Sequence, residues 1–302
     1  MISREYHLKF IMPCFCAGAD QGRAELRSSS VRGALRWWFR ALGGTPSEEN
    51  EVFGCIAETS EKLRSSAIIL RTEITKQGVP WELPAIDSKN FSSYIWYFVS
   101  ESGGKSGESE TKAPGPRWSK TAFIPQGTEW TLHFLQRRNL TEELQKKLEE
   151  TLDCFLALGS IGLRITRGLG AFVCKEQPFC LENVRQILET KGFKIEVKSS
   201  PQQVEQIAET IGGFVKGTRK SRGWRNDSEY GSETPSPMGT SKPRQTSAIY
   251  FRPVSLESGK MQLVIFEAPH KRVLCEEARV KEGQIVGHQP SWLTMANSNS
   301  RH

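Results

Sequence analysis

Histidine and aspartate are scarce in this chain of 302 residues. The five histidines lie isolated from one another, and only four aspartates accompany them. No paired carboxylates, Ser-His-Asp set or nucleotide-binding loop can be recognised, so the residues give no support to acid–base or nucleophilic catalysis. Asp20 could in principle bind a metal or assist attack by a 2′-hydroxyl, but a lone Asp in a glycine-containing loop more often forms a turn. We therefore expect a protein that is not an enzyme, with no catalytic residue, no metal site and no cofactor.

Long apolar runs and regularly spaced cysteines are also missing. No run of about 18 apolar residues occurs, so we expect no membrane span, and the first residues lack the apolar core of a signal peptide. The seven cysteines include one close pair, Cys14-Phe15-Cys16, whose spacing does not fit a zinc knuckle. We expect all seven to be reduced packing residues in a cytoplasmic protein that binds no membrane.

Positive charge is concentrated in three windows, 27–40, 159–172 and 216–225. The net charge is +7, yet these windows carry four, two and five net positive charges, so the rest of the chain is net negative. Localised charge of this kind is typical of a surface that binds a polyanion. The sequence therefore predicts a protein that holds nucleic acid without cutting it. The candidate RNA-binding residues are Arg27, Arg32, Arg36, Arg40, Gly162, Arg164, Arg167, Gly168, Gly170, Lys216, Arg219, Lys220, Arg222, Trp224, Arg225 and Arg244.

Apolar periodicity predicts an α+β fold. In the first half we expect a strand at 5–12, a helix at 30–42, a short helix near 50–56, strands at 67–75 and 129–136, a helix at 141–158 and a strand at 171–175. This order is that of the βαββαβ ferredoxin-like unit, which RNA-recognition modules share. In the second half we expect a helix at 182–190, a strand at 193–198, a helix at 201–215 that ends at Gly212-Gly213, a long basic loop at 216–247, and strands at 246–253 and 261–267. The domains would be 1–178 and 179–302.

The predicted helix at 30–42 carries an arginine stripe of Arg32, Arg36 and Arg40. We expect a serine from 28–30 to cap this helix and Val31, Leu35, Trp38 and Leu42 to form its core face. The stripe has no acidic partner at i±4, and arginine matches phosphate oxygens in a bidentate way, so we interpret it as phosphate-binding. A solvated face and a supporting role beneath the glycine-rich loop are the alternatives. Trp37 would either stack on a base or, as we favour, pack against the second domain.

The second window is glycine-rich, with four glycines where a simple turn needs one. A tight turn is the alternative, but bare backbone would let a phosphate approach while Arg164 and Arg167 add charge. A strand follows, so the pattern is not a P-loop. In the third window Trp224 lies between Arg222 and Arg225, which suits unstacked bases as well as a solvated loop.

Four segments resemble motifs of the CRISPR-associated RAMP proteins. They are ELRSSSVRGALRWWFRAL (25–42), NEVFG (50–54), IGLRITRGLG (161–170) and RQTSAIYFRPV (244–254), with the paired tryptophans most like those of the capping subunit of type III-B (Cmr) effector complexes. Ala248 stands where the last motif usually has proline.

The resemblance implies two ferredoxin-like domains packed together in a non-catalytic subunit. Such a subunit would lie near the 3′ end of the guide RNA, help to hold guide and target RNA, and contact other RAMP subunits. The alternatives are a metal-independent RAMP endoribonuclease that processes guide RNA, and a protein–protein adaptor without direct RNA contact.

Overall fold

The computed structural model describes most of the chain. The described residues are 1–20, 22–55, 64–79, 91, 93–96, 123–177, 181–202, 204–221, 237–239, 246–255 and 261–276. The junction predicted between the two domains, at 178–179, lies outside these ranges.

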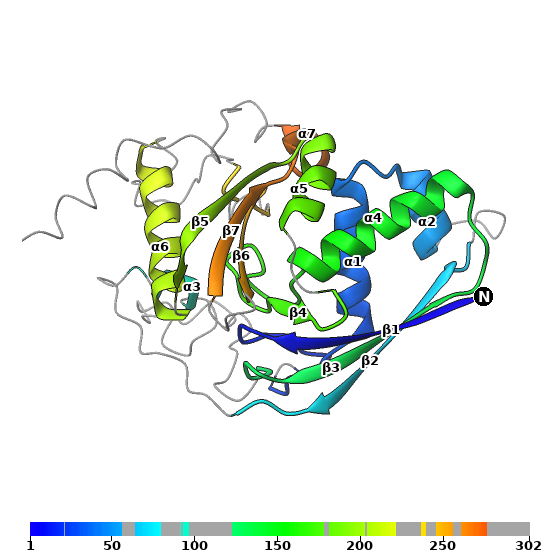
Figure 1. The fold of residues 1–302 in the computed structure, drawn as a ribbon, viewed down its shortest axis with the longest axis horizontal. Coiled ribbons are helices and arrows are strands. Elements are labelled where there is room, and N and C mark those ends of the chain that lie inside the picture. Colours follow the sequence, from blue (N-terminus) through cyan, green and yellow to red (C-terminus); the bar gives the residue numbers. More distant parts are fainter. Residues whose placement is uncertain are drawn as a thin grey trace, which may run out of the picture.

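The first domain is built on a four-stranded antiparallel sheet. Its strands are β1 (Ile2–Phe10), β2 (Ile68–Lys76), β3 (Glu129–Gln136) and β4 (Phe172–Cys174), in the order β2-β3-β1-β4. The helices α1 (Ser28–Ala41) and α4 (Glu142–Leu158) cover one face of this sheet, and α2 (Pro46–Phe53) follows α1 (Figure 1). This topology is the ferredoxin-like βαββαβ unit that the sequence predicts.

Helix α1 is anchored by its apolar stripe. Val31, Leu35 and Trp38 are buried as predicted, because positions three and four apart share one helix face. The predicted serine cap is wrong. Arg27 occupies the N-cap and makes no side-chain cap, while the Ser30 hydroxyl lies 3.2 Å from the Cys16 thiol.

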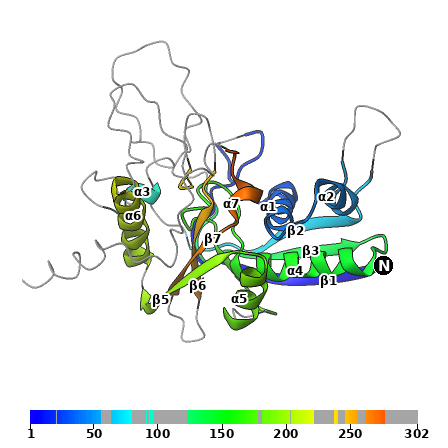
Figure 2. The ribbon, with the colours of Figure 1, turned by 90° about the horizontal axis from the view of Figure 1, so that it is seen from above.

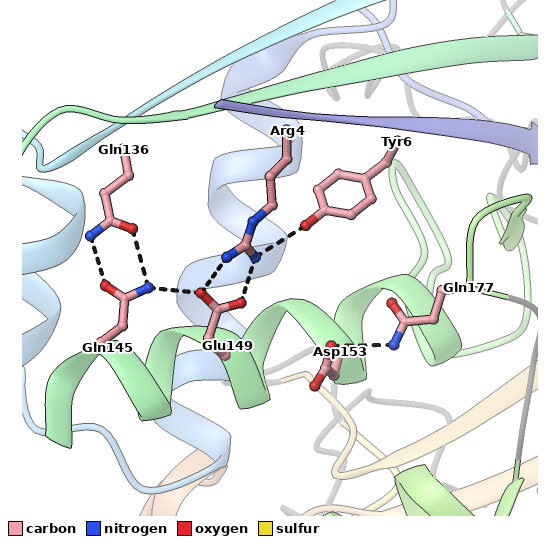
Figure 3. Close-up of polar contacts among 7 residues, drawn as sticks. All are labelled: Arg4, Tyr6, Gln136, Gln145, Glu149, Asp153 and Gln177. Carbon is pink, nitrogen blue, oxygen red and sulfur yellow. Dashed lines mark hydrogen bonds and ion pairs between the residues drawn. The ribbon is translucent and has the colours of Figure 1, made fainter. Parts of the chain in front are cut away.

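Helix α4 is fixed to the sheet by a polar network (Figure 3). Both terminal nitrogens of Arg4 donate to Glu149, at 2.5 and 2.8 Å, and Gln145 donates to the same carboxylate at 2.7 Å. Gln145 also exchanges hydrogen bonds with Gln136 of β3. Here an arginine charge is directly balanced by a carboxylate, so the network stabilises the helix on the sheet.

The second domain has a three-stranded antiparallel sheet. Strands β5 (Lys194–Gln202), β6 (Ile249–Ser255) and β7 (Met261–Glu267) lie in the order β5-β7-β6. Helices α5 (Leu181–Thr190) and α7 (His270–Val273) lie near the first domain, and α3 (Ser93–Trp96) packs beside α6 (Val204–Ser221) (Figures 1 and 2). The β5-α6-β6-β7 order repeats the first three strands of a ferredoxin-like unit, and the part of the chain that is described adds no fourth strand to this sheet.

The predicted end of the helix at Gly212-Gly213 is wrong. Helix α6 continues through this pair to Ser221. A Cβ on Gly212 would lie 1.9 Å from the Phe91 carbonyl oxygen, so the glycine serves a close approach of two backbones. Residues 216–221 are consequently helical rather than part of a loop.

The largest apolar cluster contains residues of both domains. Trp38 packs against Phe193 and Phe266, with ring centres 6.0 and 5.3 Å away. Trp37 lies 4.5 Å from the Tyr250 ring of β6, which confirms the predicted packing against the second domain. None of the described helices is long and apolar enough to cross a lipid bilayer.

Candidate nucleic-acid interface

The arginine stripe of α1 faces α2. The buried carboxylate of Glu49 accepts hydrogen bonds from Arg36 at 2.5 Å and from Arg40 at 2.8 Å. Arg32 instead donates to the carbonyls of Phe53 and Ile68, and burial lowers its pKa.

These partners weaken the argument for a phosphate-binding stripe. No acid occurs at i±4 within the helix, but Glu49 reaches the stripe from the next helix and engages two of its arginines. RNA contact by Arg32, Arg36 and Arg40 stays a prediction. The same holds for Arg27, which is exposed at the start of α1.

The glycine-rich loop packs against the segment that follows β1. The Leu163 amide donates to the Phe15 carbonyl at 2.9 Å, and the Gly170 amide donates to the Pro13 carbonyl at 2.8 Å. Gly170 has a φ of +65°, and a Cβ there would lie 1.8 Å from the Ile161 carbonyl oxygen. Gly162 and Gly168 also have positive φ, at +97° and +86°. Positive φ and close packing therefore account for these glycines without a bound phosphate.

Arg252 of β6 holds the same loop from the second domain. Its Nε donates to the Leu158 carbonyl at 2.6 Å, and its Nη1 donates to the Ile165 carbonyl. The side chain is buried, and burial lowers its pKa. Arg252 lies in one of the four family-like motifs, but the sequence indicates no role for it. The loop is thus a junction between the two domains.

Three arginines converge on Tyr94 of α3. The guanidinium carbons of Arg164 and Arg167 lie 5.0 and 5.9 Å from the centre of its ring. Arg164 donates to the Tyr94 carbonyl at 2.5 Å, whereas Arg167 and Arg219 donate to carbonyls of the 237–239 turn, at 2.8 and 2.9 Å. We call Tyr94, Arg164, Arg167 and Arg219 the arginine–tyrosine cluster.

Positive charge dominates the surroundings of Tyr94. Burial would raise the pKa of Tyr94, but the charges of Arg167, Arg219 and Arg164 outweigh it and lower that pKa to about 8. Arg167 is only 4% exposed, and the Nε groups of Arg167 and Arg219 are buried without a hydrogen-bond acceptor. Within the described ranges, neither arginine forms an ion pair with a carboxylate. Because burying unpaired N–H groups and charge is costly, the arrangement favours an added anion.

Comparison with known proteins identifies the family. The family model of the RAMP superfamily matches residues 7–173, which is more than half of the chain. The chain belongs to the RAMP superfamily.

Among proteins of known sequence, two from Pyrococcus furiosus resemble this RAMP protein. It is 28% identical to CRISPR system Cmr subunit Cmr1-1 over 49% of its own length and 40% of that protein's. It is 28% identical to Cmr subunit Cmr1-2 over 55% of its own length and 91% of that protein's. The match therefore spans less than half of one relative and most of the other.

Solved structures share the fold of this RAMP protein. The crystal structure of Cmr1 from Pyrococcus furiosus in its apo form matches with a TM-score of 0.58 and 18% identity, over 99% of this chain and 97% of that one. A second match is a chain from the structure of the type III-B Cmr-beta complex bound to cognate target RNA and AMPPnP in the presence of ssDNA. Its TM-score is 0.53 and its identity 14%, over 88% of this chain and 94% of that chain. These likenesses confirm the α+β ferredoxin-like class.

The structure brings together only some of the predicted site residues of this RAMP protein. Arg164, Arg167 and Arg219 meet at Tyr94, which could not be predicted because nothing in the sequence around it marks it as a site residue. On the same helix as Arg219, the Lys216 ammonium lies 5.1 Å from the centre of the Phe91 ring. The other predicted side chains of this region lie outside the described residues: Lys220, Arg222, Trp224, Arg225 and Arg244.

Asp20 forms a turn. Its Oδ1 accepts a hydrogen bond from the Gly22 amide at 2.9 Å, which is the turn-forming role expected of a lone Asp. Among the residues that the structure describes, no three His, Cys, Asp or Glu side chains gather in a way that could hold a metal ion.

Proposed function

We propose that this RAMP protein is a non-catalytic, RNA-binding subunit of a type III-B CRISPR effector complex. In this proposal it caps the filament near the 3′ end of the guide RNA, helps to bind target RNA, and works in the cytoplasm beside other RAMP subunits. The resemblance to Cmr1-1 and Cmr1-2 supports membership of such a complex.

The arginine–tyrosine cluster is the observation that carries the RNA-binding proposal. Arg4 donates to the Glu149 carboxylate and Arg252 to loop carbonyls, so both have acceptors for their guanidinium groups. Arg167 and Arg219 keep a buried Nε without an acceptor. A phosphate oxygen is an acceptor of the right charge, and an RNA backbone supplies one at every nucleotide.

The position of the cluster favours RNA over a small anion. It lies where the glycine-rich loop, α3 and α6 meet, and α6 carries further positive charge from Lys216 toward Ser221. A row of positive charges along one helix suits a chain of phosphates more than a single ion.

A salt titration of RNA binding tests the proposal. We expect single-stranded RNA to bind the wild-type protein with an affinity that falls steeply with salt. Arg219→Gln should weaken binding several-fold and reduce the slope of log affinity against log salt by about 0.7, the value for one lost contact on a single strand. Arg64→Gln is the matched control, since it removes the same charge from an exposed ion pair with Glu51.

Two results would count against the proposal. If Arg219→Gln and Arg64→Gln reduce the affinity for RNA equally, binding depends on the net charge of the protein and not on the cluster. A wild-type protein without measurable RNA affinity would favour the protein–protein adaptor.

The proposed lack of catalysis has its own test. The described histidines lie apart from the cluster, and His7, His133 and His270 each contact a glutamate. Incubation with guide precursor or target RNA, with and without divalent metal, should give no cleavage. Specific cuts that vanish in a single His or Asp20→Ala variant would instead identify an endoribonuclease.

A further inference from the structure

Strand β2 lies at an edge of the first sheet. It pairs with β3 on one side, and the order of the sheet ends with it on the other (Figure 1). A strand at an edge presents a row of backbone N–H and C=O groups that can pair with a further strand. The RNA-binding proposal does not use this edge, which lies away from α3 and α6 in both views (Figures 1 and 2).

The backbone groups that β2 presents at this edge follow from its pairing with β3. The Arg137 amide donates to the Ala67 carbonyl at 2.8 Å, so the carbonyl of Ala67 points toward β3. These groups alternate in direction along a strand, so those of Leu70, Thr72 and Ile74 point away from β3. Among the described residues, no backbone hydrogen bond crosses the edge at these three positions.

Both ends of this open row are closed. The Ile68 carbonyl accepts hydrogen bonds from the Ser66 hydroxyl at 2.7 Å and from Arg32 at 3.3 Å. At the other end, the pairing of β2 with β3 is interrupted by a bulge between Ile74 and Lys76. Bulges and lysines commonly protect a sheet edge. The segment open to a further strand is therefore 70–74.

The exposed side chains of 70–74 are complementary to those of the same segment read in reverse. Arg71 and Glu73 are both exposed on the open face of the sheet, and the Glu73 side chain is 69% exposed. Arg71 forms no ion pair with any part of the chain that the structure describes, and Glu73 lies 3.7 Å from His133. Reversing the strand direction about Thr72 exchanges the positive position with the negative one.

We propose that a second copy of this chain pairs with β2 along this edge, antiparallel and about a two-fold axis at Thr72. Thr72 of each copy then exchanges two backbone hydrogen bonds with Thr72 of the other, and Leu70 pairs in the same way with Ile74 of the other copy. Arg71 of each copy lies directly opposite Glu73 of the other, with their Cα atoms about 4.5 Å apart. The two-fold axis forms each contact twice.

Charge determines this register and this partner. An axis at Arg71 would place two arginines opposite each other, and an axis at Glu73 would place two glutamates opposite each other. Like charges directly opposite destabilise a strand pair, whereas opposite charges stabilise it. A second copy carries the matching charges, which an arbitrary extended segment of another protein does not.

Sedimentation equilibrium tests the proposal without reference to RNA. Because only residues 70–74 of each copy pair, the interface is small, and we expect a dissociation constant on the order of 100 μM. The mean mass of the wild-type protein should rise from that of the monomer to that of the dimer as its concentration passes this value. A mass that stays monomeric throughout overturns the proposal and leaves the edge to a segment of another protein.

An exchange of charges tests the register. Arg71→Glu and Glu73→Arg each place like charges opposite each other, so each should weaken the dimer by about tenfold or more. The variant with both changes has opposite charges in every facing pair and the net charge of the wild type, so it should dimerise as the wild type does. A mixture of the two single variants should form a mixed dimer, because each then meets the opposite charge.

A matched control separates the edge from net charge. Glu189→Arg makes the same change of charge as Glu73→Arg at an exposed position of α5 in the second domain, and it should leave the dissociation constant unchanged. Circular dichroism and thermal unfolding check that every variant folds. The proposal is overturned if the double variant and the mixture both stay monomeric. It is also overturned if Glu189→Arg weakens the dimer as much as Glu73→Arg does.

Discussion

The Arg164 guanidinium lies over the Tyr94 ring, with its carbon 5.0 Å from the ring centre. Arg164 also has a φ of +58°, the left-handed backbone conformation that side chains other than glycine seldom adopt. A strained backbone that directs a cation onto an aromatic ring indicates that the surrounding structure fixes this contact.

Tyr94 should ionise at a lower pH than the other described tyrosines, Tyr6 and Tyr250. Its pKa is about 8, while burial raises that of Tyr6 and that of Tyr250. The absorbance of tyrosinate is measured against pH in the wild-type protein and in the Tyr94→Phe variant. The difference between the two curves should rise with a midpoint near pH 8. Arg219→Gln should move this midpoint upward, because it removes one of the charges that lower the pKa. A midpoint near the ordinary tyrosine value of about 10 would contradict the described cluster.

The same ionisation sets an expected pH dependence. Tyr94 has a lower pKa in the folded than in the unfolded chain, so between about 8 and 10 the unfolded state binds more protons and stability gains from rising pH. This contribution is lost as the pH falls through about 8. RNA affinity should instead fall as the pH rises through about 8, because the Tyr94 phenolate then competes with phosphate for the arginines. Binding of RNA should therefore raise the pKa of Tyr94, which the same absorbance measures.

Gly170→Ala should destabilise the fold strongly. The added Cβ would lie 1.8 Å from the Ile161 carbonyl oxygen at a φ of +65°. We expect the free energy of unfolding to fall by at least about 2 kcal/mol in denaturant titrations. Gly33→Ala is the matched control, since a Cβ there meets nothing within 4 Å on the exposed side of α1. It should stabilise the protein by about 0.5–1 kcal/mol, and equal effects of the two changes would contradict the described loop.

Glu49→Gln should loosen the contact between α1 and α2. It keeps the shape of the side chain but removes the carboxylate that Arg36 and Arg40 share. Both arginines are partly exposed, so we expect the free energy of unfolding in denaturant titrations to fall by about 1–3 kcal/mol. This is less than the full cost of breaking a buried ion pair. Glu51→Gln removes an exposed ion pair with Arg64 and should change stability by less than about 0.5 kcal/mol. A Glu49→Gln protein as stable as wild type would show that this carboxylate contributes little to the contact between α1 and α2.

Trp37→Ala separates packing from base stacking. Because Trp37 packs against Tyr250 of the second domain, we expect a loss of about 2–3 kcal/mol in unfolding free energy. RNA affinity should stay unchanged at temperatures where the variant is folded. Weaker RNA binding with normal stability would instead place Trp37 against a base.

Local pattern was enough to predict β3 and α4 of the first domain closely. The predicted strand at 129–136 coincides with β3, and the predicted helix at 141–158 coincides with α4 within one residue. In both, apolar residues repeat with the period of the element, and Thr141 marks the start of α4 through its hydrogen bond from the Leu144 amide. Contacts along the chain determine such features, so the sequence displays them.

The end of α6 could not be predicted in this way. A glycine pair usually ends a helix, but Gly212 lies against Phe91, a residue far away in the sequence. The packing of α3 on α6 therefore outweighs the local preference of glycine.

The sequence by itself determined the α+β class, the core face of α1 and the clustering of positive charge, because each depends on spacing along one segment. Only the tertiary structure decided which arginines are balanced. Glu49 meets Arg36 from thirteen residues away and Arg40 from nine, across a helix junction. Arg167 and Arg219 instead turn inward to Tyr94, with no described carboxylate beside them. The energy of a charge depends on its neighbours in space, and only the fold assembles those neighbours.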